Sequence, residues 1–128
     1  VLVMDKAFSL VASDPADSVF SGIASMQNHP HFSWKNPNRV RALYSAFSLR
    51  NPEQFHRLDG KGYQLLLDAV RRLDPINPQV AARLITPLLS WRRFDSSRQQ
   101  LMLAALTELA SQADLSNDLY EKVSRSLA

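Results

Sequence analysis

Five of the seven prolines in this chain directly follow an Asn or Asp, and these pairs constrain the fold more than any other feature. An Asx side chain can accept the free amide hydrogens of a first helical turn, while a proline at the next position has a preset φ and no N–H to satisfy. Most of these pairs therefore predict helix starts. They are Asp14-Pro15, Asn36-Pro37, Asn51-Pro52, Asp74-Pro75 and Asn77-Pro78.

Apolar residues at helical spacing follow these signals. Val40, Leu43, Tyr44 and Phe47 form an i, i+3, i+4, i+7 stripe, which is typical of a helix with one buried face. Similar stripes predict further helices. They cover about 15–27, the segment after Gly60 and Gly62, the segment after Pro78 and the last third of the chain. We also expect a short helix from Pro52 to His56. The stripes are Val19, Ile23 and Met26; Leu66, Leu67, Val70 and Leu73; Val80, Leu84, Ile85 and Leu88; Met102, Ala105, Leu106 and Leu109; and Leu119, Tyr120, Val123 and Leu127.

Three further signals refine the predicted helix boundaries. Ser96 with Gln99 three residues later has the pattern of a capping box, and Ser116 precedes the last amphipathic segment. Pro87 lies inside the pattern after Pro78, so we expect a kink or an early end there. No segment alternates with period two over the length of a strand, and the predicted class is therefore all-α.

Two segments begin alike, forty-one residues apart: "NPNRVRALYSAF" at 36–47 and "NPQVAARLITPL" at 77–88. That period lies within the range of HEAT and armadillo repeats. Connections between the predicted helices are mostly short, which makes neighbouring helices antiparallel. We therefore expect antiparallel helical hairpins stacked as an armadillo/HEAT-like α-superhelix, with residues 1–128 forming one domain.

Composition narrows the possible functions. The chain has 128 residues and no cysteine, which rules out disulfides, thiolate zinc sites and cysteine nucleophiles. No apolar run approaches the roughly 20 residues that cross a bilayer, and we expect no membrane partner. The absence of cysteine fits a cytoplasmic protein, although a cysteine-poor periplasmic protein stays possible.

The sequence contains no catalytic motif. A His-Glu-x-x-His zinc motif, a Gly-x-Ser-x-Gly elbow and a glycine-rich phosphate loop are all absent. His29 and His31 are possible metal ligands, but a proline separates them and no Glu or Cys lies nearby, so a packed or solvated loop is the simpler interpretation. We expect no catalytic residue and no metal ligand in this chain.

Basic pairs raise the alternative of nucleic-acid binding, because the net charge is +3 and Arg92-Arg93 lies between Trp91 and Phe94. Such side chains can hold phosphates and stack bases. However, "SWRRFD" also has the pattern of a helix end followed by a capping aspartate, and interspersed acids leave no long basic stripe. We therefore expect no nucleic-acid partner.

Arg41 and Arg83 are the more informative cations. Each lies on the flank of a predicted helix beside a core stripe, where a guanidinium can bind carbonyls or a carboxylate and keep its charge. A structural role at helix ends is the alternative that the residues alone leave open.

Several longer phrases resemble one known family. "NPNRVRAL", "NPQVAARLITPL", "FHRLDGKGYQLL", "RQQLMLAALTELA" and "LSNDLYEKVSRSLA" are similar to the C-terminal helical domain of bacterial aminopeptidase N, a zinc-dependent gluzincin peptidase. The resemblance runs from about Met4 to Ala128. It implies a parent enzyme that releases N-terminal amino acids from peptides, with its zinc and catalytic residues in an upstream domain.

The resemblance also implies roles for this chain. It would be a non-catalytic cap on the upstream catalytic domain, with Arg41 and Arg83 facing the cavity that holds the peptide. No cofactor is expected in the chain itself, and zinc is expected in the parent. The chain would start inside the domain, so we expect Leu2, Val3 and Phe8 to be exposed. The alternative is a stand-alone helical-repeat scaffold for protein interactions.

Overall fold

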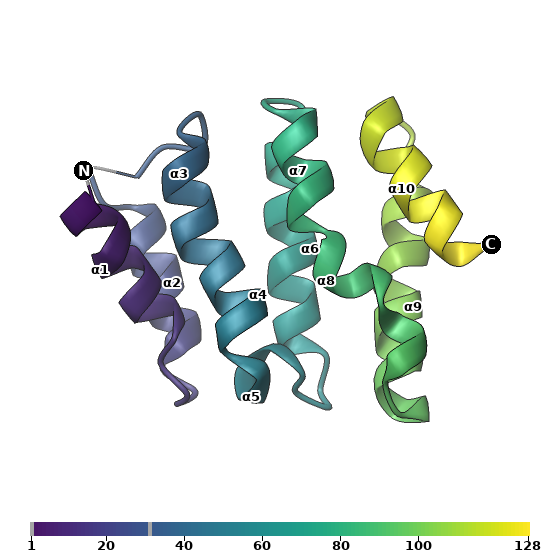
Figure 1. Ribbon diagram of the computed structural model, residues 1–128, viewed down its shortest axis with the longest axis horizontal. Coiled ribbons are helices and arrows are strands. Elements are labelled where there is room, and N and C mark those ends of the chain that lie inside the picture. The colour runs from purple at the N-terminus through teal and green to yellow at the C-terminus, as the bar shows by residue number, and fades with distance from the viewer. Residues whose placement is uncertain (1, 31) are drawn as a thin grey trace. The chain divides into compact units, whose positions relative to one another are not determined.

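Helices account for all the regular secondary structure in residues 2–30 and 32–128, which this computed structural model describes, with side chains from Lys6 onward (Figure 1). The elements in chain order are α1 (Leu2–Ala12), α2 (Val19–Gln27), α3 (Pro37–Val40), η1 (Arg41–Ser45), α4 (Ala46–Arg50), α5 (Pro52–Phe55), α6 (Lys61–Leu73), α7 (Pro78–Leu84), α8 (Thr86–Leu89), η2 (Trp91–Arg93), α9 (Ser96–Ala110) and α10 (Asn117–Leu127). They group into two units, one ending at Phe55 and one beginning at His56.

The first unit is built around one long helix. Elements α3, η1 and α4 are continuous, since the backbone keeps helical angles through the π-helical turn of η1. The helix α1 packs against α2 and against this long helix. The stripe predicted from Val40 to Phe47 is buried, and the largest core side chains around it are Phe8, Ile23, Leu43, Tyr44, Phe47 and Phe55.

The second unit packs four main helices. The helix α6 contacts α7 and α9, and α10 contacts the same two helices. The predicted apolar faces of α6, α7 and α9 are all buried, and α10 contributes Leu119 and Val123. Tyr120 is an exception, because about half of its side chain, 52%, is exposed rather than packed in the predicted stripe.

The Asx-Pro prediction is confirmed at three helix starts. The side-chain oxygen of Asn36 accepts hydrogen bonds from the backbone N–H groups of Asn38 and Arg39, at 3.1 and 3.4 Å. The side chain of Asn77 accepts from the N–H of Val80 at 3.2 Å. Asn51 does the same for Gln54 at the start of α5, at 3.4 Å. The repeated beginnings therefore satisfy free amide groups of first helical turns.

The helix predicted from 15 to 27 begins later, at Val19. Asp14 Oδ1 accepts from the N–H of Ala16 at 3.0 Å, and Oδ2 accepts from the Ser18 hydroxyl at 3.0 Å. The carbonyl of Asp14 also receives a hydrogen bond from the Asn51 amide at 2.7 Å. Residues 14–18 therefore form turns, because Asn51 takes the Asp14 carbonyl that would accept the first bond of a helix beginning at Pro15.

Asp74-Pro75 does not start a helix either. Asp74 directly follows α6, and its side chain is almost fully buried, at 2% exposure. The carboxylate binds Ser116, the N-cap of α10, rather than amides of its own segment. A tertiary contact therefore takes the oxygen atoms that a local cap would have used.

Three smaller predictions have different outcomes. The start of α9 is capped by Asp95, which accepts from the N–H of Arg98 at 3.2 Å, so the predicted capping box at Ser96 is wrong. The interruption at Pro87 is confirmed, because α7 ends at Leu84 and α8 begins at Thr86. Phe8 is fully buried, which contradicts its predicted exposure. The side chains of Leu2 and Val3 lie outside the described part.

Candidate functional site

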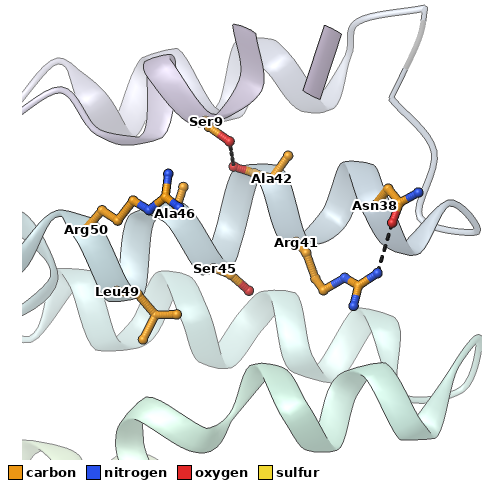
Figure 2. A pocket seen from close by; sticks show the side chains of 8 residues that line it. All are labelled: Ser9, Asn38, Arg41, Ala42, Ser45, Ala46, Leu49 and Arg50. Atoms are coloured by element: carbon orange, nitrogen blue, oxygen red, sulfur yellow. Dashed lines mark hydrogen bonds between the residues drawn. The ribbon is translucent and has the colours of Figure 1, made fainter. Parts of the chain in front are cut away.

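An open groove of about 390 Å³ lies in the first unit, between α1 and the long helix. It is lined by Ser9, Asn38, Arg41, Ala42, Ser45, Ala46, Leu49 and Arg50 (Figure 2). The hydroxyl of Ser9 donates a hydrogen bond to the carbonyl of Ala42 at 3.1 Å, which joins α1 to the long helix. Ala42 and Ala46 have small side chains, so a shallow channel stays open between α1 and the long helix where larger side chains would fill the space.

Arg41 lies at one end of this groove and is exposed. Its Nη2 donates to Asn38 Oδ1 at 2.9 Å, and its Nε donates to the carbonyl of Pro37 at 3.3 Å. Both acceptors are neutral, so they hold the guanidinium in place and leave its charge uncompensated. Arg41 is also the first residue of the π-helical turn, a feature often found at functional sites.

Arg50 lies at the other end, as the last residue of α4. Figure 2 shows its side chain running back along the helix toward Ala46. Neither a hydrogen bond nor an ion pair joins this side chain to the residues that the structure describes. Leu49 beside it is 69% exposed, more than any other large apolar side chain described.

Four other arginines in the described ranges have carboxylate partners, whereas Arg83, Arg92 and Arg93 have none there. Arg57 pairs with Asp59 at 2.8 Å, Arg71 with Glu108 at 2.8 Å, Arg98 with Asp95 at 2.9 Å and Arg125 with Glu121 at 2.6 Å. Arg41 and Arg50 have no such partner among the same residues. The groove therefore combines two uncompensated positive charges with apolar surface, which suits a carbonyl-rich or anionic ligand.

Arg83 occupies a different groove, in the second unit between α7 and α10. This groove measures about 400 Å³ and is lined by Gln79, Ala82, Arg83, Asp118, Glu121, Lys122 and Arg125. Arg83 is exposed there, among charges of both signs. The structure thus places both predicted arginines on open grooves, each within its own unit; that these grooves face a substrate cavity stays a prediction.

A third cluster surrounds His56. Its Nδ1 lies 2.6 Å from the Tyr63 hydroxyl, and its ring packs against Phe94 with 4.5 Å between centroids. The Nε of Arg98 donates to the His56 carbonyl at 2.8 Å. Burial and then the Arg98 charge lower the pKa of His56, and burial raises the pKa of Tyr63 to about 12. Both side chains are thus held neutral at pH 7, as expected of packing groups.

The possible metal and nucleic-acid sites are placed as follows. His29 packs edge-on against Phe8 at 5.8 Å, and His31 lies outside the described residues. No three His, Cys, Asp or Glu residues in 2–30 and 32–128 are arranged to hold a metal ion. The Trp91 indole donates to Ser126, and Arg92 stacks on that indole at 4.2 Å.

Across the described parts of the chain, none of the helices combines the length and the apolar character that a bilayer span requires.

The sequence prediction missed Arg50 and Leu49. Both follow Phe47, the last apolar residue of the predicted stripe, and they precede Asn51-Pro52, so they resembled an ordinary solvated helix end. The available signal was a leucine next to an arginine without an acidic residue three or four positions away on the same helix. That pattern leaves an exposed apolar side chain beside an unpaired charge.

Comparison with known proteins identifies related chains. A family model described as a domain of unknown function with ARM repeats (DUF3458_C) matches residues 1–128, which confirms the predicted helical-repeat class. The chain is 48% identical over 126 residues to aminopeptidase N of Haemophilus influenzae, covering 98% of this chain and 14% of that protein. For aminopeptidase N of Escherichia coli the identity is 46% over 127 residues, covering 99% and 15%.

A solved structure is also similar. It is the crystal structure of Legionella pneumophila aminopeptidase A in complex with aspartic acid, with a TM-score of 0.90 and 35% identity. The match covers 97% of this chain and 14% of that one. The chain thus spans only about one seventh of the length of the proteins it matches.

Proposed function

Because this chain belongs to the family of ARM-repeat domains that form the C-terminal helical domain of bacterial aminopeptidase N, we propose that it caps an aminopeptidase catalytic domain and lines the substrate cavity. On this proposal, the parent enzyme releases N-terminal amino acids from peptides. The catalytic domain precedes this one in the same chain and supplies the zinc. On the same proposal, the residues that cleave the peptide bond belong to that catalytic domain.

The observation that carries the proposal is the state of Arg41. It is exposed on an open groove, held by two neutral acceptors, and has no carboxylate partner among the described residues. A fixed guanidinium of this kind can bind a peptide carbonyl or carboxylate without losing affinity to an internal ion pair. Arg83, exposed on the groove of the second unit, would supply a further contact.

Such contacts act on binding and position. Contacts with parts of the peptide far from the cleaved bond raise the effective concentration of that bond at the catalytic centre and restrict its orientation. Arginines that bind distant parts of a peptide therefore affect long substrates and leave short ones unaffected. This difference separates a substrate-lining role from a structural one.

The test uses the full-length parent enzyme. Arg41→Ala and Arg83→Ala should each lower kcat/KM for a peptide of several residues while leaving an amino-acid arylamide unchanged. Arg93→Ala is the matched control, because Arg93 is exposed and its side chain has no hydrogen bond or ion pair within the described part of the chain. Equal losses on peptide and arylamide would contradict the proposal.

A further inference from the structure

We infer that Arg50, together with Arg41 and the apolar floor between them, forms a binding site for a carboxylate of the peptide, remote from the bond that is cleaved. This inference rests on the proposed function and extends it, because it adds a residue and a chemical class of substrate. The site favours peptides that carry an acidic side chain or a free C-terminal carboxyl group at this groove.

The charge of the groove is the first argument. Arg41 and Arg50 both line it, and among the side chains that the structure describes no Asp or Glu does. Four other arginines pair with a carboxylate within 2.9 Å in the described part of the chain, whereas the described lining of this groove holds no acid. A ligand carboxylate would supply the missing partner.

The position of Arg50 is the second argument. The guanidinium extends back along the helix toward Ala46, over the channel rather than away from it (Figure 2). Arg41 is anchored at the opposite end by Asn38 and Pro37. The two cations thus bracket one channel, and a groove that faces peptide at Arg41 also presents Arg50 to it.

The apolar surface is the third argument. Ala42 and Ala46 form the floor, and Leu49 is 69% exposed beside Arg50. An inorganic anion would gain nothing from this surface. A peptide brings methylene groups and neighbouring aliphatic side chains, whose burial against the leucine is favourable. The combination favours a peptide carboxylate over a phosphate or another small anion.

The experiment measures kinetics of the full-length enzyme on matched peptides. One pair differs by Glu or Gln at a single downstream position, with both C-termini amidated; the second pair has no acidic side chain and differs by a free or amidated C-terminus. Arg50→Ala should raise KM about three- to fivefold for the acidic member of at least one pair and leave kcat and the neutral member unchanged. The pair that responds identifies the source of the carboxylate.

Two variants and one condition serve as controls. Arg93→Ala removes the same charge elsewhere and should leave all ratios unchanged, while Arg50→Lys should restore much of the preference. The preference should also weaken as salt rises from 0.05 to about 0.5 M, because exposed charges are screened. An unchanged arylamide kcat/KM verifies that the Arg50→Ala enzyme is folded.

The contrary outcomes are distinct. If Arg50→Ala changes acidic and neutral peptides equally, or changes neither, the carboxylate site is wrong. The proposed function is then judged separately, by the effect of Arg41→Ala on peptide against arylamide. If inorganic phosphate at millimolar concentration abolishes the preference of the parent enzyme while sulfate and chloride at equal ionic strength do not, the site is a phosphate site and the inference is also wrong.

Discussion

The carboxylate of Asp74 receives two hydrogen bonds from Ser116, one from its backbone N–H at 2.8 Å and one from its hydroxyl at 2.5 Å. Asp74 directly follows α6 and Ser116 caps α10, so one buried side chain joins the end of one helix to the start of another. The Ser116 hydroxyl in turn accepts from the N–H of Leu119 at 3.2 Å. The carboxylate of Asp74 therefore fixes the Ser116 backbone and also orients the hydroxyl that caps α10.

Replacement of Asp74 should reveal the strength of this joint. Asp74→Ala leaves the Ser116 groups without their acceptor in a part-buried position, which costs about 1–3 kcal/mol for a group of this kind. Urea unfolding should show that loss as a lower midpoint with an unchanged slope. Asp114→Ala, which removes an exposed acid of the same type nearby, is the control. Equal midpoints for the two variants would contradict the role assigned to Asp74.

The helix caps give a second prediction. Asn36→Ala and Asn77→Ala each remove a side-chain acceptor from a first helical turn and should each lower the free energy of unfolding by about 1 kcal/mol. Asn36→Asp and Asn77→Asp, which keep an acceptor, should recover most of that loss. Asn117→Ala is the control, because Asn117 lies just after the cap of α10. A loss at Asn117 as large as at Asn36 would argue against capping.

The sequence predicted those elements whose signals are local. The stripe from Val40 to Phe47 and the caps at Asn36 and Asn77 depend on residues at most seven positions apart, and the structure confirms them. The break at Pro87 is equally local, because a missing N–H and a ring clash act within one turn. Fold class and most helix faces follow from such signals.

The failures involve contacts between distant residues. Asp14 and Asp74 have the same local pattern as Asn36, but Asn51 donates to the backbone carbonyl of Asp14, and Ser116 donates to the carboxylate of Asp74. Phe8 was expected to be exposed, but it is fully buried, and aromatic rings from later segments contact it. Nothing within one helical turn of these residues indicates their partners.

The candidate site was predicted only in part. Arg41 and Arg83 were singled out, and both lie on open grooves. Arg50 and Leu49 were not singled out. Their significance depends on the lack of a carboxylate partner for Arg50 among the described residues and on the channel beside α1. Such features of the surface become visible only when the helices are packed.

The pH dependence of stability should report on His56. Burial, followed by the nearby Arg98, lowers its pKa in the folded chain below the unfolded value of 6.5. Between the two values the unfolded chain binds more protons, so the free energy of unfolding rises with pH through this range. The contribution is fully present above about pH 6.5 and is lost as the pH falls through the folded pKa.

The measurement compares urea unfolding at pH 5 and pH 7.5 for the parent and His56→Gln. The variant should be less stable than the parent at pH 7.5, since it loses ring packing on Phe94, and should show a smaller change between the two pH values. His29→Gln is the control for replacing a histidine that packs against another aromatic ring. If His56→Gln keeps the full pH dependence of the parent, the assignment to His56 is wrong.

The end of α10 provides the last prediction. Arg92 donates to the carbonyls of Ser126 and Ala128, both at 2.9 Å, and stacks on the ring of Trp91 at 4.2 Å. The last carbonyls of a helix have no partner within it, so a cation placed there satisfies them and complements the helix dipole. Arg92→Ala should therefore increase amide hydrogen exchange over residues 119–128, while Arg93→Ala, which removes a neighbouring charge without these contacts, should not. Because the two arginines are adjacent, equal exchange in both variants would show that net charge, and not the contacts of Arg92, stabilises this end of the chain.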